Sequence, residues 1–136
     1  MIQVLIFGAS GYTGAELVKL VCAHPEMTLL QAFNSGSSAA EQFDEIHPGL
    51  AGNSLAATGT KLVPATQQAL DNLPDADAAF LALPHEVSAT LAPKLISRGI
   101  LVFDLSGAFR INEASVFERF YGFKHPNFDH VARAFY

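Results

Sequence analysis

The stretch IQVLIFGASGYTG (residues 2–14) decides the fold, because an apolar run of strand length leads directly into three glycines. A stretch of helical period follows over residues 15–23. Gly8 would allow the tight turn off the strand, Gly11 the approach of a phosphate to the backbone, and Gly14 close packing of the helix on the sheet. Free N–H groups at a helix N-terminus attract a pyrophosphate. The stretch therefore predicts a dinucleotide site, and a glycine-rich turn without a ligand is the alternative.

Strand-length apolar runs alternate with helical stretches along the rest of the chain. We expect strands at residues 2–7, 27–33, 60–65, 78–83 and 100–105, and helices at residues 15–23, 66–73 and 86–97. The last two strands are nearly all apolar, which predicts burial on both faces. The alternation predicts a doubly wound α/β fold with a parallel sheet and a ligand crevice at the carboxyl ends of its strands. We expect one Rossmann-type dinucleotide-binding domain over residues 1–136.

Two parts of the chain are less regular. Residues 34–59 mix small and polar side chains, and we expect one short helix near residues 41–46. The tail, residues 111–136, adds no obvious strand but carries seven aromatic residues that need a partner surface: Phe117, Phe120, Tyr121, Phe123, Phe128, Phe135 and Tyr136.

The composition excludes several classes of partner. The net charge is −5 and the eight basic residues form no cluster, which argues against nucleic acid and anionic membranes as partners. No export signal is recognisable and no apolar run approaches about 18 residues, so we expect a cytoplasmic protein. The single cysteine, Cys22, lies in an apolar helical stretch and is interpreted as a buried thiol, not a nucleophile. No paired ligand spacing predicts a metal site.

The end of the second expected strand bears on the choice of cofactor. An NAD site would place an acidic residue there for the ribose 2′-hydroxyl, but no carboxylate occurs before Glu41. The segment instead offers the Asn34 amide, backbone N–H groups and the hydroxyls of Ser35, Ser37 and Ser38, which can bind a 2′-phosphate. We therefore expect NADP as the cofactor, and a merely flexible polar loop is the alternative.

Two later segments end strands on the same expected edge of the sheet. Pro84 and His85 follow the fourth strand, where a lone histidine fits a local hydrogen-bonding role as well as a catalytic one. We interpret His85 as lining the cofactor site. The fifth strand ends in FDLSGAFR (residues 103–110). Arg110 in this segment suits forked binding of a phosphate or carboxylate on an anionic substrate, with an ion pair to Asp104 as the alternative.

With these motifs in order, the chain resembles the N-terminal part of the N-acetyl-γ-glutamyl-phosphate reductase family. The resemblance runs over essentially the whole chain. It rests on GASGYTGAEL (residues 8–17), His47-Pro48 followed by Leu50, FLALPHEVSATLAP (residues 80–93), VFDLSGAFR (residues 102–110) and YGFKH (residues 121–125). The aspartate-semialdehyde dehydrogenases share the glycine loop and are the nearest alternative family.

The resemblance implies a reaction and a set of site residues. In this family a cysteine thioester formed from an acyl phosphate is reduced with NADPH to a semialdehyde, in arginine biosynthesis. The resemblance places the cofactor against Gly8, Ser10, Gly11, Tyr12, Thr13 and Gly14, the 2′-phosphate near Ser35, Ser37 and Ser38, the nicotinamide near Pro84, His85 and Ser106, and the substrate phosphoryl group at Arg110.

The chain also departs from the family pattern. The segment that carries the family's nucleophilic cysteine and the later catalytic histidine has no counterpart among these residues, and Cys22 does not match its context. We therefore expect no catalytic residue here, an inactive fragment on its own, and a catalytic and dimerisation domain that lies outside this chain. The intact enzyme is expected to be a homo-oligomer acting on a small-molecule acyl phosphate. A non-catalytic NADP-binding module is the alternative from a different functional class.

Overall fold

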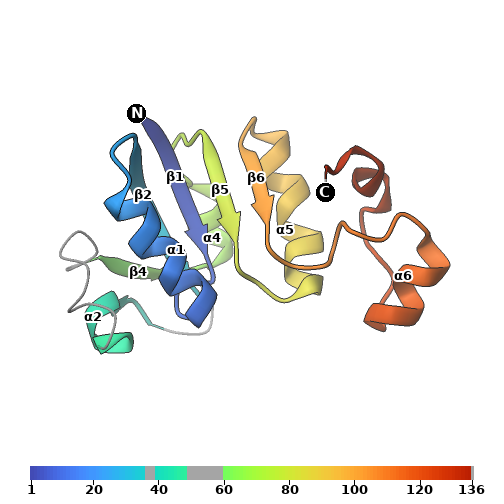
Figure 1. The fold of residues 1–136 in the computed structure, drawn as a ribbon, viewed down its shortest axis with the longest axis horizontal. Helices are drawn as coiled ribbons and strands as arrows, with labels where there is room; N and C mark the ends of the chain where they lie inside the picture. The colour runs from blue at the N-terminus through green and yellow to red at the C-terminus, as the bar shows by residue number, and fades with distance from the viewer. Residues whose placement is uncertain (36–38, 49–59, 136) are drawn as a thin grey trace.

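A computed structural model of the chain describes residues 1–35, 39–48 and 60–135. Its sheet has the strand order β3-β4-β2-β1-β5-β6 (Figure 1). All neighbours pair in parallel except β3 and β4, which are antiparallel. The strands are β1 (Ile2–Phe7), β2 (Met27–Asn34), β3 (Glu41–Gln42), β4 (Lys61–Pro64), β5 (Ala78–Leu81) and β6 (Leu101–Asp104).

Helices cover both faces of this sheet, as the alternation of strands and helices predicts. One apolar cluster joins β1 to α1 and α2, and a second joins β1 and β5 to α5. The helical elements are α1 (Tyr12–Ala23), α2 (Phe43–Ile46), α4 (Gln67–Asp71), α5 (His85–Ser97), α6 (Ala114–Tyr121) and the 3-10 helix η2 (Phe128–Arg133). The doubly wound α/β prediction is confirmed, and the carboxyl ends of the parallel strands share one edge.

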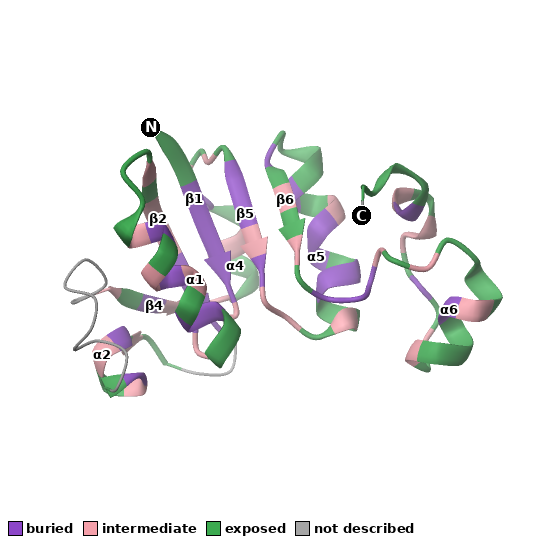
Figure 2. Cartoon of the chain, viewed as in Figure 1, coloured by how far each residue is buried: buried purple, intermediate pink, exposed green. Residues whose placement is uncertain are grey.

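The expectation that the last strand is buried on both faces is wrong. β6 is an edge strand, and Leu101 and Phe103 are 61% and 45% exposed (Figure 2). By register these two residues pair with Ala78 and Phe80. Among the described residues no helix packs over them, because α1 covers β1 and β2 on that face. An apolar sequence shows what a strand can bury, whereas its cover depends on elements elsewhere in the chain.

The irregular segment after β2 differs in part from the prediction. The short helix occurs, but it begins at Phe43, because Glu41 and Gln42 pair with Leu62 and Lys61 of β4 as a two-residue strand. Residues 36–38 and 49–59 of this segment lie outside the described residues.

The aromatic tail finds most of its partner surface within itself. Phe117 is fully buried, and the rings of Tyr121, Phe123 and His125 lie 4.8, 5.1 and 5.0 Å from it. The Asn127 side chain donates to the Ala89 carbonyl of α5 at 3.2 Å, which ties the tail to the domain. Phe120 and Phe135 remain largely exposed, at 73% and 104%. Tyr136 lies outside the described residues.

Candidate functional site

The glycine loop between β1 and α1 is built by backbone contacts that require glycine. Gly8 has a φ of +83°, and a Cβ on it would overlap the Ala82 carbonyl. A Cβ on Gly14 would overlap the Gly8 carbonyl, so α1 packs directly on the loop. The N–H groups of Gly8 and Ala9 both donate to the Phe33 carbonyl, at 3.0 and 2.8 Å. The loop is thus fixed to β2 as well as to its own helix.

The mouth of this loop is open to a ligand. Gly11 is the N-cap of α1 and makes no side-chain cap, so the first N–H groups of the helix keep the unsatisfied donors of a helix N-terminus. Gly11, Tyr12 and Thr13 are exposed there, and Ser10 is half-buried. This geometry suits an anionic group held by backbone donors, as the sequence predicts.

His47 braces the same loop from α2, a contact that no sequence pattern indicated. Its side chain is buried, and Nε2 lies 3.3 Å from the Ala9 carbonyl. Its ring also packs on that of Phe43, with centroids 5.2 Å apart. The His47-Pro48 pair thus has a structural task, which is to hold α2 against the glycine loop.

At the carboxyl end of β2, Asn34 uses both of its amide donors within the chain. Nδ2 donates to the Ala39 carbonyl and to Glu41 Oε2, each at 2.8 Å, and the residue is only 1% exposed. Because both partners are acceptors, the amide cannot be flipped, and Oδ1 is left buried without a partner among the described residues. The interpretation of this amide as a donor to a phosphate is therefore wrong. Ser35 is exposed beside it, and Ser37 and Ser38 lie outside the described residues.

A cavity of about 350 Å³ opens at this edge of the sheet. It brings together three residues predicted from different strand ends, Gly8, Ser35 and Pro84. Its other lining residues are Phe7, Asn34, Ala65, Leu70, Leu83, Val87, Thr90, Leu91 and Lys94. The lining is mostly apolar, which suits a flat ring system, and Lys94 supplies a cation.

Lys94 was missed in the sequence, although a signal for it exists. Val87, Leu91 and Lys94 stand four and three residues apart on α5, so they share one face of the helix. Pro84 directly precedes α5. Assigning Pro84 to the crevice therefore also places this face of α5, with Lys94 on it, at the same cavity.

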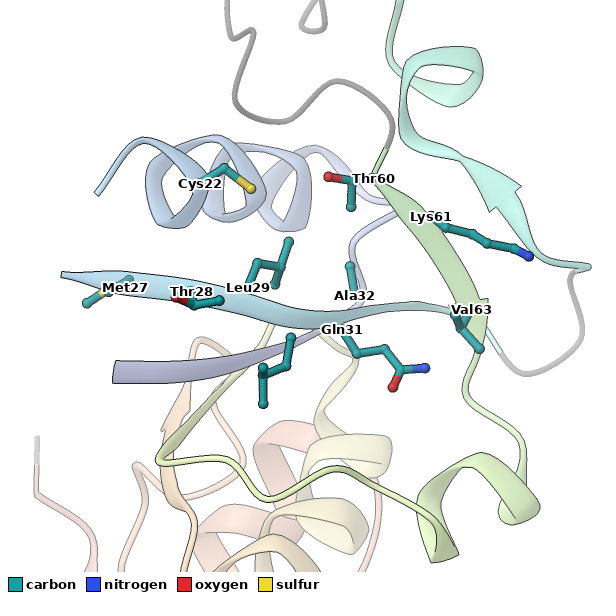
Figure 3. Close-up of a pocket in the computed structure, with 10 residues that line it drawn as sticks. Cys22, Met27, Thr28, Leu29, Gln31, Ala32, Thr60, Lys61 and Val63 are labelled. Carbon is teal, nitrogen blue, oxygen red and sulfur yellow. The ribbon is translucent and has the colours of Figure 1, made fainter. Parts of the chain in front are cut away.

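A second cavity, of about 540 Å³, has a lining that runs along β2 from Met27 to Ala32 and includes residues of β4 (Figure 3). Met27 and Thr28 at the amino end of β2, Thr60 and Lys61 at the start of β4, and Cys22 line it. Burial raises the pKa of the Cys22 thiol, and its hydrogen bond with Thr60 opposes that shift. Cys22 is partly buried, less than the sequence interpretation has it. A thiol that stays protonated is a poor nucleophile, which agrees with the other half of that interpretation. Ligands of open α/β sheets bind at the carboxyl ends of strands, so the first cavity is the better candidate.

The loop after β6 is held by its own polar side chains. Ser106 Oγ donates to Asp104 Oδ2 at 2.7 Å and accepts from the Ala108 N–H at 3.0 Å. The Ser106 N–H donates to the other Asp104 oxygen at 3.0 Å. Ser106 is buried, so its hydroxyl serves the loop rather than the crevice surface.

His85 and Arg110 both belong to the surroundings of this loop. His85, the first residue of α5, accepts a hydrogen bond at Nδ1 from the Gly107 N–H at 2.9 Å. Arg110 is exposed, and its Nη2 lies 3.5 Å from the Leu105 carbonyl. The structure therefore brings His85 and Ser106 to one loop, with Arg110 at the end of that loop.

Two findings on the described residues concern membrane-spanning helices and metal sites. Across residues 1–35, 39–48 and 60–135, no helix has both the length and the hydropathy to cross a membrane. Over the same ranges, no three residues among histidine, cysteine, aspartate and glutamate gather closely enough to hold a metal ion.

Comparison with known proteins identifies the family. Residues 3–134 match the family described as semialdehyde dehydrogenase, NAD binding domain. The chain belongs to this family. The family description gives a nicotinamide dinucleotide as the cofactor of such a domain, and the glycine loop and the carboxyl-edge cavity agree with that description.

Curated relatives carry a more specific name. An N-acetyl-gamma-glutamyl-phosphate reductase of Aeromonas salmonicida is 42% identical over 139 aligned residues, which cover 100% of this chain and 40% of that protein. The reductase of the same name from Escherichia coli K12 is 42% identical over 131 residues, covering 92% and 36%. The chain thus spans about 40% of the length of the relatives that it matches.

Solved structures share the fold of this semialdehyde dehydrogenase domain. An aspartate semialdehyde dehydrogenase of Candida albicans, solved with NADP, superposes with a TM-score of 0.56 at 17% identity, covering 84% of this chain and 32% of that one. Aspartate semialdehyde dehydrogenase II of Vibrio cholerae gives a TM-score of 0.60 at 18% identity, covering 84% and 33%. At these identities the likeness shows the fold alone.

Proposed function

We propose that this chain is the NADP-binding part of an N-acetyl-γ-glutamyl-phosphate reductase, which reduces an acyl phosphate to a semialdehyde. The observation that carries the proposal is the 42% identity to relatives of that name across the whole chain. The bound NADPH would supply the hydride for the reduction. The residues of this chain bind and orient the cofactor and the substrate phosphate.

The glycine loop fits a pyrophosphate. The N–H groups at the start of α1 face the mouth of the loop. Among the described residues, a Cβ on Gly11 would meet only the Gly8 carbonyl, at 3.5 Å. Residues 10–14 therefore offer both room for an anionic group and backbone N–H donors, and we assign them to the pyrophosphate. Ser10, Tyr12 and Thr13 border it.

The cavity fits the adenosine half of the cofactor. Phe7, Leu83 and Leu91 give apolar walls for the adenine ring, and Ser35 with Lys94 lies on the same lining. A 2′-phosphate would gain a hydroxyl donor and a positive charge there. These observations favour NADP. Lys94 would bind the 2′-phosphate, a role for which the segment after β2 has no arginine.

The remaining assignments follow the strand ends. We assign Pro84 and His85 to the nicotinamide side, Ser106 to the support of the loop that borders it, and Arg110 to the phosphoryl group of the substrate. The thioester chemistry implied by the family needs a cysteine thiolate, and the raised pKa of Cys22 makes it unsuitable. This chain alone would therefore bind the cofactor without reducing substrate, and the intact, homo-oligomeric enzyme would supply the nucleophile.

Calorimetric titration of the 136-residue chain with NADPH and with NADH tests the proposal. We expect tighter binding of NADPH, weakened about tenfold by Lys94→Gln and less by Ser35→Ala, with NADH binding unchanged. Lys124→Gln, an exposed lysine that does not line the cavity, is the matched control. Equal binding of the two cofactors would withdraw the NADP assignment, and binding of neither would overturn the proposed function of this site.

A further inference from the structure

The side chain of His85 joins two loops that lie 22 residues apart in the sequence. It stands at the first position of α5, directly after the turn that follows β5. Its Nδ1 accepts from the Gly107 N–H in the loop after β6, at 2.9 Å. When Nδ1 of a neutral imidazole accepts, the proton is on Nε2. The contact therefore fixes both the ring orientation and the tautomer of His85.

Tyr121 completes the enclosure of Gly107. Its ring lies 4.5 Å from that of His85, and a Cβ on Gly107 would overlap the Tyr121 hydroxyl. Gly107 is buried, so a larger residue there would have to displace the Tyr121 side chain of α6 or move the loop. Glycine is needed at this position because the Tyr121 side chain lies so close to it. The backbone conformation does not require glycine, since the φ of Gly107 is not in the left-handed region.

Gly107 in turn connects to Arg110. The Arg110 N–H donates to the Gly107 carbonyl at 3.3 Å, closing a turn over residues 107–110. On the other side, Asp104 and Ser106 hold the beginning of the loop. The His85 side chain thus binds the backbone at the centre of the loop, and Arg110 lies at the end of the turn that starts at Gly107.

We propose that His85 is a positioning residue that holds Arg110 for the phosphoryl group of the substrate, acting through Nδ1, Gly107 and the turn at residues 107–110. This inference rests on the proposed function. It adds to the cofactor-lining role of the ring, because the lining contact needs only the ring face, whereas positioning needs the acceptor at Nδ1.

Three substitutions separate these two properties. His85→Asn keeps an acceptor near the place of Nδ1 and loses the ring. His85→Phe keeps the ring on Tyr121 and loses the acceptor, which leaves the Gly107 N–H without its partner. His24→Phe is the matched control, because His24 Nδ1 also accepts a backbone N–H, that of Glu26 at 3.1 Å, far from the carboxyl edge.

In the intact reductase, His85→Phe should raise the KM for the acyl phosphate about tenfold, with the KM for NADPH changed less than about threefold. His85→Asn should recover most of the acyl-phosphate KM, and His24→Phe should match wild type. In the 136-residue chain, amide exchange of Gly107 should be faster in His85→Phe and near the wild-type rate in His85→Asn.

The opposite results would overturn the proposal in distinguishable ways. If His85→Asn is as impaired as His85→Phe, the acceptor at Nδ1 is not what matters. If His85→Phe weakens NADPH and acyl phosphate equally, or neither, His85 does not act through Arg110. If the wild-type enzyme itself fails to reduce acyl phosphates, the proposed function fails and this inference fails with it.

Discussion

Adding one methyl group at Gly14 should test how closely the cofactor loop is packed. A Cβ there would lie 2.7 Å from the Gly8 carbonyl carbon and 2.8 Å from the Ala9 Cα. Ordinary carbon contacts are about 3.5 to 4.0 Å, so α1 must move away from the loop by roughly 1 Å. The atoms that this Cβ meets are all backbone, so the overpacking cost should lie in the upper part of the usual range, about 2 to 3 kcal/mol. The better helix propensity of alanine offsets about 0.8 to 1.0 kcal/mol of this cost.

We therefore expect Gly14→Ala to lower the free energy of unfolding by about 1 to 2 kcal/mol, or Tm by about 3 to 8 °C. NADPH affinity should fall as well, since the first N–H groups of α1 move with the helix. Thermal unfolding by circular dichroism, with and without NADPH, measures both effects.

Gly11→Ala is the companion variant, because within the described part of the chain its Cβ would meet only the Gly8 carbonyl, at 3.5 Å. It should cost at most about 1 kcal/mol, as glycine is a modestly better N-cap than alanine. Its Cβ nevertheless enters the mouth of the loop, so NADPH binding should fall by more than stability does. A Gly14→Ala chain as stable as wild type, or a Gly11→Ala chain with undiminished NADPH affinity, would refute this account of the loop.

Three further predictions follow from buried groups. Because burial raises the pKa of Cys22, iodoacetamide at pH 7.5 should alkylate it more slowly in the folded chain than in urea, and equal rates would contradict its burial. Burial also lowers the pKa of His125 from its ordinary 6.5, so the unfolded chain takes up this proton more readily. Its contribution to stability is full above pH 6.5 and decreases as the pH falls toward the lowered value, so Tm should drop on acidification, and less steeply in His125→Gln. Ser106→Ala removes the hydroxyl bonded to Asp104 and Ala108, and should destabilise the chain by about 1 to 3 kcal/mol in urea titrations; an unchanged midpoint would remove Ser106 from the loop's support.

The sequence predicts most of the fold because the signals are local. β1 has the predicted bounds, since its apolar run ends at a glycine that must leave the strand. Helix α1 begins at Tyr12, three residues before the predicted start, because its N-cap is Gly11 and lacks the serine or aspartate that usually marks such a start. The strand at Glu41 and Gln42 has no periodicity to detect, since two residues gain strand geometry only from their partners in β4.

The site is predictable to the extent that it is made of backbone and strand ends. The glycine loop could be predicted from three glycines and the residues that flank them. The roles of Asn34 and Lys94 could not be predicted, because each depends on where another segment of the chain lies. The Asn34 amide already donates to Glu41, and Lys94 lines the cavity from a helix that follows a different strand. Residue type indicates which hydrogen bonds are available, whereas only the fold shows which are already used.

Long-range contacts of one kind recur along the carboxyl edge of the sheet. His47 binds the carbonyl of Ala9 in the loop after β1, and His85 accepts from Gly107 in the loop after β6. In each case a side chain from one connection binds the backbone of another, so neighbouring loops are fixed to one another and not only to their own strands. Loops are the mobile parts of most folds, and a site built from them gains precision only when such bonds remove their freedom before the ligand arrives. The edge is therefore preorganised by its histidines, which is why we expect substitutions at these two positions to change ligand affinity at sites that the imidazoles do not themselves fill.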